Sequence, residues 1–243
     1  MKRQLLVSLI ATTATLSTFS ANAFASSLVP QQEGEINVGL GCIDPDPNKC
    51  IEANSIPFIE SIKSIEDDST GNKSRLFVDD FSTANTYGSG TNAIQFQIRD
   101  AGTNPDEFWF RPSEHDANLG HGEENGQLEV GTFKFTFTQM LADLTIDFFD
   151  TESKNTTGVI AINGISLDSP DWVAKGQDSN IVSQTFFDIT SITLKLGHDR
   201  NNGTGDGVDF QASSVDIPEP TALLGLLGIG LFGAVSKGKK EKN

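Results

Sequence analysis

The sequence predicts an all-β protein, an antiparallel β-sandwich of jelly-roll-like type that lies between two terminal targeting segments. Apolar and polar residues alternate with a period of two through much of the chain, which is typical of strands that bury one face. Clusters of Gly, Asn, Ser and Asp separate these stretches at short intervals, as turns do. A helical period of apolar residues is almost absent, so a two-layered β architecture is the economical solution.

Residues 1–25 have the composition of a secretory signal peptide. Two basic residues, Lys2 and Arg3, precede an uncharged stretch, Leu5–Ser20, and small-x-small cleavage patterns lie within residues 21–25. We therefore expect an exported domain at residues 26–216, which has the size of a single domain.

The exported domain is strongly acidic. Without the two targeting segments, 11 basic and 31 acidic residues remain, a formal net charge near −20. Such a surface is soluble, attracts divalent cations and is repelled by nucleic acid and by anionic lipid headgroups. Nucleic acid is therefore not an expected partner.

The two cysteines, Cys42 and Cys50, both lie in the exported part and flank a short Pro-rich loop. In an oxidising exterior this spacing predicts a disulfide, which stabilises a loop of this size by about 2 to 3 kcal/mol. A zinc site is the alternative, but no further pair of ligands lies nearby in the sequence.

Along the domain, the clearest strand is the stretch in which Phe133, Phe135 and Phe137 alternate with polar residues. Further strands are expected at residues 75–81, 94–98, 107–111, 143–149, 157–162, 181–187, 192–196 and 207–215. The pair Asn163-Gly164 predicts a tight hairpin turn. Residues 55–67 fit either a short helix or an edge strand, because isoleucine recurs there every three residues.

Catalytic chemistry is not indicated. The segment 114–125, EHDANLGHGEEN, is rich in metal ligands but matches no metallohydrolase spacing, and we interpret it as a solvated loop. Ser113 lies close to His115, yet the chain has no G-x-S-x-G nucleophile elbow. We expect no cofactor other than a candidate structural calcium ion in the Gly-rich loop near the end of the domain, with Asp199, Asp206 and Asp209 as ligands. A flexible polar turn is the alternative interpretation of that loop.

Aromatic residues raise the question of carbohydrate binding. Trp109, Trp172 and Tyr87 are the candidates for stacking on a sugar ring, provided that their rings are exposed. The alternative is that each tryptophan fills the core or closes one end of the sandwich.

Residues 217–243 form a second targeting segment. Pro218, Glu219 and Pro220 precede the uncharged run Thr221–Val235, and four lysines follow that run. Fifteen residues in a helix span about 22 Å, which is short against a hydrocarbon core of about 30 Å. We expect a short transmembrane helix with its basic end in the cytoplasm.

This tail resembles the PEP-CTERM sorting signal of bacterial exosortase substrates. Within the domain, Leu128-Glu129-Val130-Gly131 spells the tetrapeptide of the LEVG group of such proteins, which is found mainly in cyanobacteria. The resemblance implies export, an intermediate anchored in the inner membrane, processing by an exosortase, and final residence at the cell surface or in the extracellular matrix. It supplies no catalytic residues.

Three functions are compatible with these features. We expect a non-enzymatic surface or matrix protein whose sandwich binds polysaccharide; the alternative is a secreted polysaccharide hydrolase. The first predicts a shallow face with an exposed aromatic ring, and the second predicts a deep cleft with two facing acids whose pKa values diverge. A purely structural matrix component without a ligand is the third hypothesis.

Overall fold

The protein was analysed as a computed structural model that describes residues 25–90, 93–98, 107–116, 118, 129–177, 179–200, 203–206 and 208–215. All the described residues belong to one compact unit, Phe24–Ile217. The two targeting segments lie outside the described residues.

The described residues form strands and two short 3-10 helices, η1 (Pro47–Lys49) and η2 (Ala53–Ser55). The predicted β class is therefore confirmed. The strands of the main sheet are β1 (Ala25–Ser27), β2 (Gly34–Asn37), β3 (Cys50–Glu52), β4 (Ile59–Ile65), β5 (Lys73–Asp80), β8 (Phe108–His115), β9 (Gly131–Phe149), β10 (Gly158–Ile162), β11 (Ile165–Trp172), β12 (Ile181–Leu196) and β15 (Asp209–Val215). Two separate hairpins join β6 (Asn85–Tyr87) to β7 (Ile94–Phe96), and β13 (His198–Arg200) to β14 (Gly203–Asp206).

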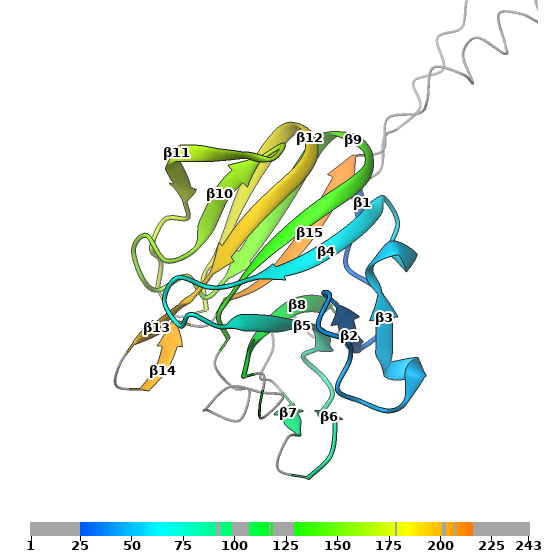
Figure 1. Ribbon diagram of the computed structural model, residues 1–243. Helices are drawn as coiled ribbons and strands as arrows, with labels where there is room; N and C mark the ends of the chain where they lie inside the picture. Colours follow the sequence, from blue (N-terminus) through cyan, green and yellow to red (C-terminus); the bar gives the residue numbers. More distant parts are fainter. Residues whose placement is uncertain are drawn as a thin grey trace, which may run out of the picture. The chain divides into compact units, whose positions relative to one another are not determined.

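The long strand β9 lies where the sheet branches, because one of its edges pairs with two different strands in turn (Figure 1). One edge pairs with β12 along nearly the whole strand. The other edge pairs first with β4, at residues 132–137, and then with β15, at residues 145–149. The sheet forks at this point, and the second branch continues from β15 through β8, β5 and β2 to β3.

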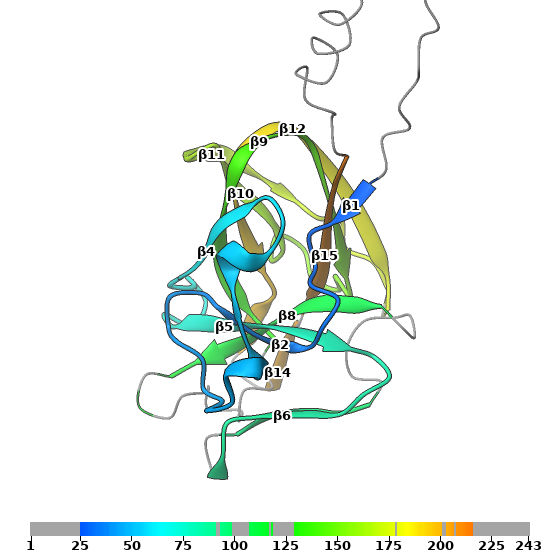
Figure 2. The ribbon, with the colours of Figure 1, turned by 90° about the vertical axis from the view of Figure 1, so that its right-hand side faces the viewer.

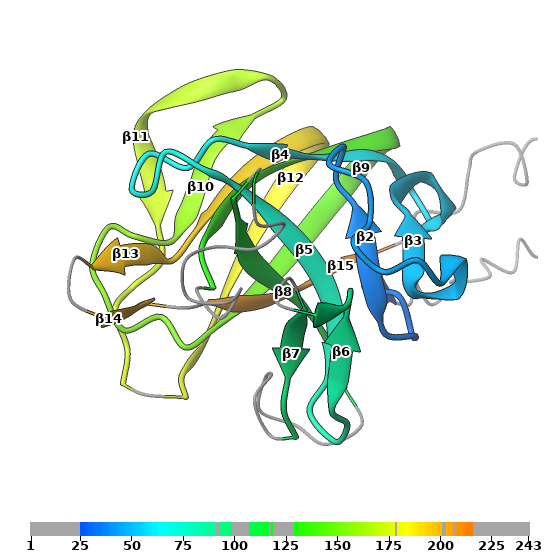
Figure 3. The ribbon, with the colours of Figure 1, turned by 60° about the horizontal axis from the view of Figure 1, so that its bottom comes forward.

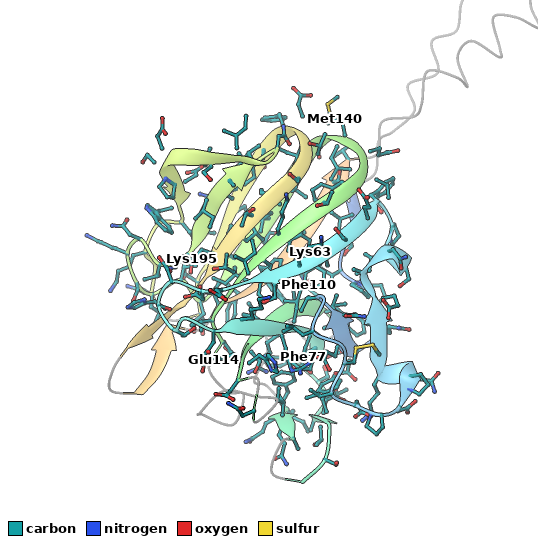
Figure 4. The ribbon with its side chains drawn as sticks, viewed as in Figure 1. Lys63, Phe77, Phe110, Glu114, Met140 and Lys195 are labelled. Carbon is teal, nitrogen blue, oxygen red and sulfur yellow. A yellow bond between two sulfur atoms is a disulfide. The ribbon has the colours of Figure 1, made fainter. Side chains whose placement is uncertain are left out.

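The second branch turns across the first, so that two layers cover a common core (Figure 3). Phe110 of β8, Phe135 of β9 and Phe210 of β15 meet in this core, with ring centroids 5.0 to 6.0 Å apart. Figure 4 shows Phe110 between the two layers. The three phenylalanines of the predicted strand, Phe133, Phe135 and Phe137, are buried as the alternation requires.

Several local predictions are changed by the sheet. Residues 143–149 and 181–187 are not separate strands. They form the last part of β9 and the first part of β12. Of the two alternatives for residues 55–67, a short helix or an edge strand, the strand is confirmed, because Ile59–Ile65 form β4. The pairing is antiparallel except between β2 and β3, which are parallel, so the sheet is mixed rather than purely antiparallel. The jelly-roll connectivity stays a prediction.

The predicted hairpin at Asn163-Gly164 is confirmed. It joins β10 to β11, and both turn residues have positive φ angles, 51° and 77°, as a tight hairpin turn needs. Because β11 runs to residue 172, Trp172 is the last residue of a strand.

Candidate functional site

The outer face of the sheet, away from the core, runs continuously from β12 through β9, β15, β8 and β5 to β2, and it has two different halves. The covered half is defined here as Glu35, Arg75, Phe77, Asp79, Trp109 and Arg111, on β2, β5 and β8. The open half is defined as Asp143, Thr145, Asp147, Ser183, Thr185, Gln211 and Ser213, on β9, β12 and β15. The two halves meet where Trp109 of β8 contacts Phe149 of β9, with ring centroids 5.8 Å apart.

The β6–β7 hairpin forms a layer against β2, β5 and β8 and lies over the covered half (Figure 2). Tyr87 and Phe96 of the hairpin pack on Phe77, at centroid distances of 4.8 and 5.1 Å. The side chain of Asn85 donates hydrogen bonds to Glu33 and Asp79, at 2.5 and 3.2 Å. The hairpin therefore excludes water from the strands beneath it.

The disulfide between Cys42 and Cys50, predicted from the sequence, is confirmed and closes a loop beside this hairpin. Lys49 in the loop donates a hydrogen bond to the carbonyl oxygen of Thr86 at 3.0 Å. The carboxylate of Asp44 accepts one from the backbone N–H of Gly88 at 3.3 Å. The bridged loop thus fastens the hairpin to the domain.

Charged side chains under the hairpin are arranged around two arginines. Arg111 lies 3.2 Å from a carboxylate oxygen of Asp79 and 4.0 Å from one of Asp209, and it also donates to Glu129. Arg75 pairs with Glu35 at 2.5 Å. Both arginines are nearly inaccessible to solvent, so these are buried ion pairs.

Burial dominates the titration of these acids. Desolvation raises the pKa of Asp79 to about 6, against the opposing effect of the Arg111 guanidinium. Desolvation likewise raises the pKa of Glu35, and the attraction of Arg75 offsets only part of the shift. The phenol of Tyr87 also has a raised pKa, because it is buried and lies near several carboxylates.

The LEVG tetrapeptide has structural roles in the same region. Leu128 lies outside the described residues, but Glu129 pairs with Arg111 and Val130 is fully buried. A Cβ atom at Gly131 would lie 2.6 Å from the ring of Phe133 and 2.8 Å from Cβ of Ser74, so only glycine fits where β9 begins. The motif therefore anchors the start of the central strand and holds an arginine.

The open half has a different character, because nothing in the described chain covers it. Its side chains form rows across three strands: Ser183, Asp147 and Gln211 in one row, and Thr185, Thr145 and Ser213 in the next. Adjacent rows along a strand are about 6.7 Å apart.

Neighbouring strands of the open half are joined by side-chain hydrogen bonds. The hydroxyls of Thr145 and Thr185 are 2.9 Å apart, and Ser183 donates to Asp147. Two exposed apolar residues, Ile181 and Phe187, flank the two rows along β12, one on each side. The arrangement presents hydroxyl, amide and carboxylate groups on a shallow surface between apolar edges.

The predicted aromatic contacts are placed differently from the expectation. Trp109 and Tyr87 are each only 1 % exposed, so neither ring can stack on a sugar at the surface, and that prediction is corrected. Trp109 fills the junction of the two halves, and Tyr87 is part of the small core under the hairpin. Trp172 is half-buried at the end of β11 and stays a candidate.

The predicted calcium ligands are not brought together by the described side chains. The carboxylate of Asp209 is buried and faces Arg111, which is incompatible with its role as a calcium ligand in the loop. The side chains of Asp199 and Asp206 lie outside the described residues. Within the parts of the chain that are described, no group of three or more His, Cys, Asp or Glu is arranged to hold a metal ion.

The candidate catalytic pair and the polar loop after it are only partly described. Ser113 is fully buried on β8, and His115 is half-buried at the end of that strand. His121 and the two glutamates that follow it lie outside the described residues. The described positions thus place the serine in the interior, away from solvent.

The two ends of the domain leave from the same place. β1 pairs with the end of β15 so that Ala25 is opposite Val215, and Leu28 donates to the carbonyl oxygen of Ala212 at 2.8 Å (Figure 2). The segment that precedes residue 25 and the one that follows residue 215 are therefore attached to one edge of the sheet.

Comparison with known proteins identifies the second of these segments. Residues 216–240 match the PEP-CTERM protein-sorting motif. The chain carries a PEP-CTERM sorting motif. Pro218, Glu219 and Pro220, the residues expected to form the signal, lie within the match. No curated protein and no solved structure matches the chain.

The motif implies exosortase-dependent sorting, so the protein is secreted and directed to the cell surface. In the described part of the chain, no helix has the length and apolar character that crossing a bilayer requires. The expected transmembrane segment, Thr221–Val235, lies outside that part.

Proposed function

We propose that the protein is a non-enzymatic surface or matrix protein of the LEVG, cyanobacterial type, which binds neutral extracellular polysaccharide through the open half of its sheet. The observation that carries the proposal is the pair of polar rows on β9, β12 and β15. The membrane holds the exported domain through residues 221–235 until an exosortase acts at the sorting motif.

The chemistry of the open half fits a hydroxyl-rich polymer. Thr145, Thr185, Ser183 and Ser213 can each donate and accept hydrogen bonds, and Gln211 adds an amide. The rows are shallow and regular, which suits an extended chain better than a compact ligand. The acidic charge of the domain disfavours an acidic polysaccharide, so the expected ligand is neutral.

The placement of the acids favours binding over hydrolysis. The acid with a strongly raised pKa, Asp79, is buried beneath the hairpin and paired with Arg111. The open half has two carboxylates, Asp143 and Asp147, on one strand of a shallow surface rather than on opposite walls of a cleft. A glycosidase needs two acids that flank the bond to be cleaved.

Affinity electrophoresis tests the proposal. The secreted form is run through native gels that contain hydroxyethyl cellulose or dextran as neutral polymers, or alginate as an acidic one. We expect the neutral polymers to retard migration and alginate to leave it unchanged. Reducing ends are measured in parallel after incubation with each polymer, and we expect none to be released.

The double variant Thr145→Ala/Thr185→Ala removes two hydroxyls from the centre of the open half. Two lost hydrogen bonds correspond to a loss of affinity of about tenfold. Ser166→Ala/Ser169→Ala is the matched control, because these serines are exposed on β11, away from the rows. Retardation that is equal in both variants would refute the assigned face, and released reducing ends would support the hydrolase. The variant Trp172→Ala tests the remaining aromatic candidate in the same gels.

Intact mass of the cell-associated and the released protein tests the sorting step. A membrane fraction whose mass includes the terminal lysines, and a released form that ends near Pro220, are the expected pair. A released form that retains Lys242 would contradict processing at the motif.

A further inference from the structure

The end of the domain from which the targeting segments leave has an unusual surface. Three of the large apolar side chains that are exposed in the described chain gather there: Met140, Ile165 and Phe187, with exposed fractions of 59, 72 and 69 %. Figure 4 shows Met140 at the end of the molecule where β15 ends.

Contacts place Met140 and Phe187 near Val215, at the end of β15. A cavity of about 130 Å³ is lined by Phe58, Met140, Ser214 and Val215, among others, so Met140 adjoins the last described residue of β15. Phe187 is opposite Asp143 on β9, and the carboxylate of Asp143 accepts a hydrogen bond from the N–H of Val215 at 2.8 Å.

The β10–β11 turn brings Ile165 to the same end. Asn163 of the turn donates to the carbonyl oxygen of Asp188 at 2.9 Å and accepts from the N–H of Thr190 at 2.7 Å. Ile165 follows this turn directly, so it lies beside the residues that come after Phe187 in β12.

We infer that this apolar end, defined by Met140, Ile165 and Phe187, contacts the lipid surface while the protein is held in the membrane. The inference rests on the proposed function, since it needs the apolar run of the sorting motif to be inserted. Five residues, 216–220, separate Val215 from that run, and they span at most about 18 Å. The headgroup region alone takes up about 5 to 7 Å of this length.

The attachment of both ends strengthens the argument. Ala25 is opposite Val215, so an uncleaved signal peptide would tether the same edge of the sheet to the membrane. A domain held this closely at one edge must turn that edge toward the bilayer. The three apolar side chains are then the first groups to reach the interface, as in proteins that place an apolar surface about 5 to 10 Å into it.

Charge at this end selects the kind of lipid. Residues 138–143, 163–166, 187–191 and 213–215 contain the carboxylates of Asp143 and Asp188 and no Lys or Arg. Neutral headgroups are therefore favoured, and anionic headgroups repel this surface.

The experiment uses the chain from residue 26 to 243 in phosphatidylcholine vesicles whose acyl chains carry bromine, which quenches tryptophan fluorescence. Phe187→Trp and Met140→Trp report on the apolar end. Ile65→Trp is the control, because Ile65 is exposed at the opposite end of β4 from Phe58. We expect the two reporters to lose about threefold more fluorescence than the control, and the loss to shrink when phosphatidylglycerol is added.

Three results would overturn the inference. If the chain does not float with the vesicles, the tether of the proposed function fails, and the contact fails with it. If it floats but all three reporters are quenched equally, the tether holds and only the contact is refuted. A dimer in detergent that Phe187→Asp converts to a monomer would assign the apolar end to a second copy instead.

Discussion

The two halves of the outer sheet face are built from the same alternation of residues, yet they do opposite things. In the covered half, charged residues are buried beneath the β6–β7 hairpin and neutralise one another around Arg75 and Arg111. In the open half, short polar side chains face solvent and are joined only to their neighbours across the strands. The cover, not the strand pattern, therefore decides whether polar residues hold the fold or are free to bind.

The hairpin also separates two kinds of polar residue: those in buried ion pairs and those available to a ligand. Long charged side chains occur where a hairpin excludes water, because an arginine can satisfy several carboxylates at once. Hydroxyls, one amide and two carboxylates occur where the surface is open, because they can exchange water for a polymer at little cost. Stability should therefore respond to the covered half, and ligand binding to the open half.

The largest expected change in the free energy of unfolding is that caused by Arg111→Ala. The substitution leaves Asp79 and Asp209 buried without their cation, which costs about 3 to 5 kcal/mol in the free energy of unfolding. In the open half, Asp147→Ala should change that free energy by less than about 0.5 kcal/mol. Urea denaturation measures both, and equal losses would abolish the distinction between the two halves.

The next effect concerns pH. The pKa of Asp79 is raised from 3.8 to about 6 by burial, so the folded state holds this proton more tightly than the unfolded chain does. The stability contributed by this group is fully present below about pH 4 and is lost as pH rises through about 6. The shift corresponds to about 3 kcal/mol.

Denaturation of the wild type and of Asp79→Asn between pH 4 and 7 checks this sign. The free energy of unfolding of the wild type, minus that of the variant, should fall as pH rises through this window. A difference that stays flat would mean that the buried carboxyl does not titrate there. Thr145→Ala, on the open half, is the control: it removes no titratable group, so its free energy of unfolding should change with pH as that of the wild type does.

The smallest of these changes in stability concerns the β6–β7 hairpin and the disulfide-closed loop that fastens it. Removing the disulfide with Cys42→Ser/Cys50→Ser should lower the free energy of unfolding by about 2 to 3 kcal/mol. Hydrogen exchange should become faster at residues 85–96, because Lys49 and Asp44 fasten that hairpin, while exchange in β9 and β12 is set by global unfolding. Faster exchange throughout the domain, with no preference for the hairpin, would show that the loop does not hold the cover.

The β class, the position of most strands and the disulfide could be predicted from the sequence, since each depends on local information. Alternation identifies a strand, Asn163-Gly164 identifies a turn, and two cysteines in an exported chain identify a bridge. The sorting motif could be recognised for the same reason, because its signal is contiguous.

The candidate site could not be predicted, because it depends on register. Residues 143–149 alternate between polar and apolar, and residues 181–187 contain Ser183 and Thr185, but only the pairing of Thr145 with Thr185 turns these residues into rows. For Trp109 the sequence left two alternatives, an exposed ring and a core ring, because alternation cannot say which face another segment will cover; the core alternative is the one found. Trp109 packs against Phe149 of β9, a contact between residues that are far apart in the sequence.

Nuclear magnetic resonance of the labelled domain during titration with a soluble cellulose oligosaccharide tests the central claim most directly. We predict that amide shifts concentrate at residues 143–147, 183–185 and 211–213, and that Asp79, Arg111 and the β6–β7 hairpin do not move. Shifts that centre on the covered half, or a hairpin that opens on binding, would contradict the division of the sheet face into a structural half and a binding half.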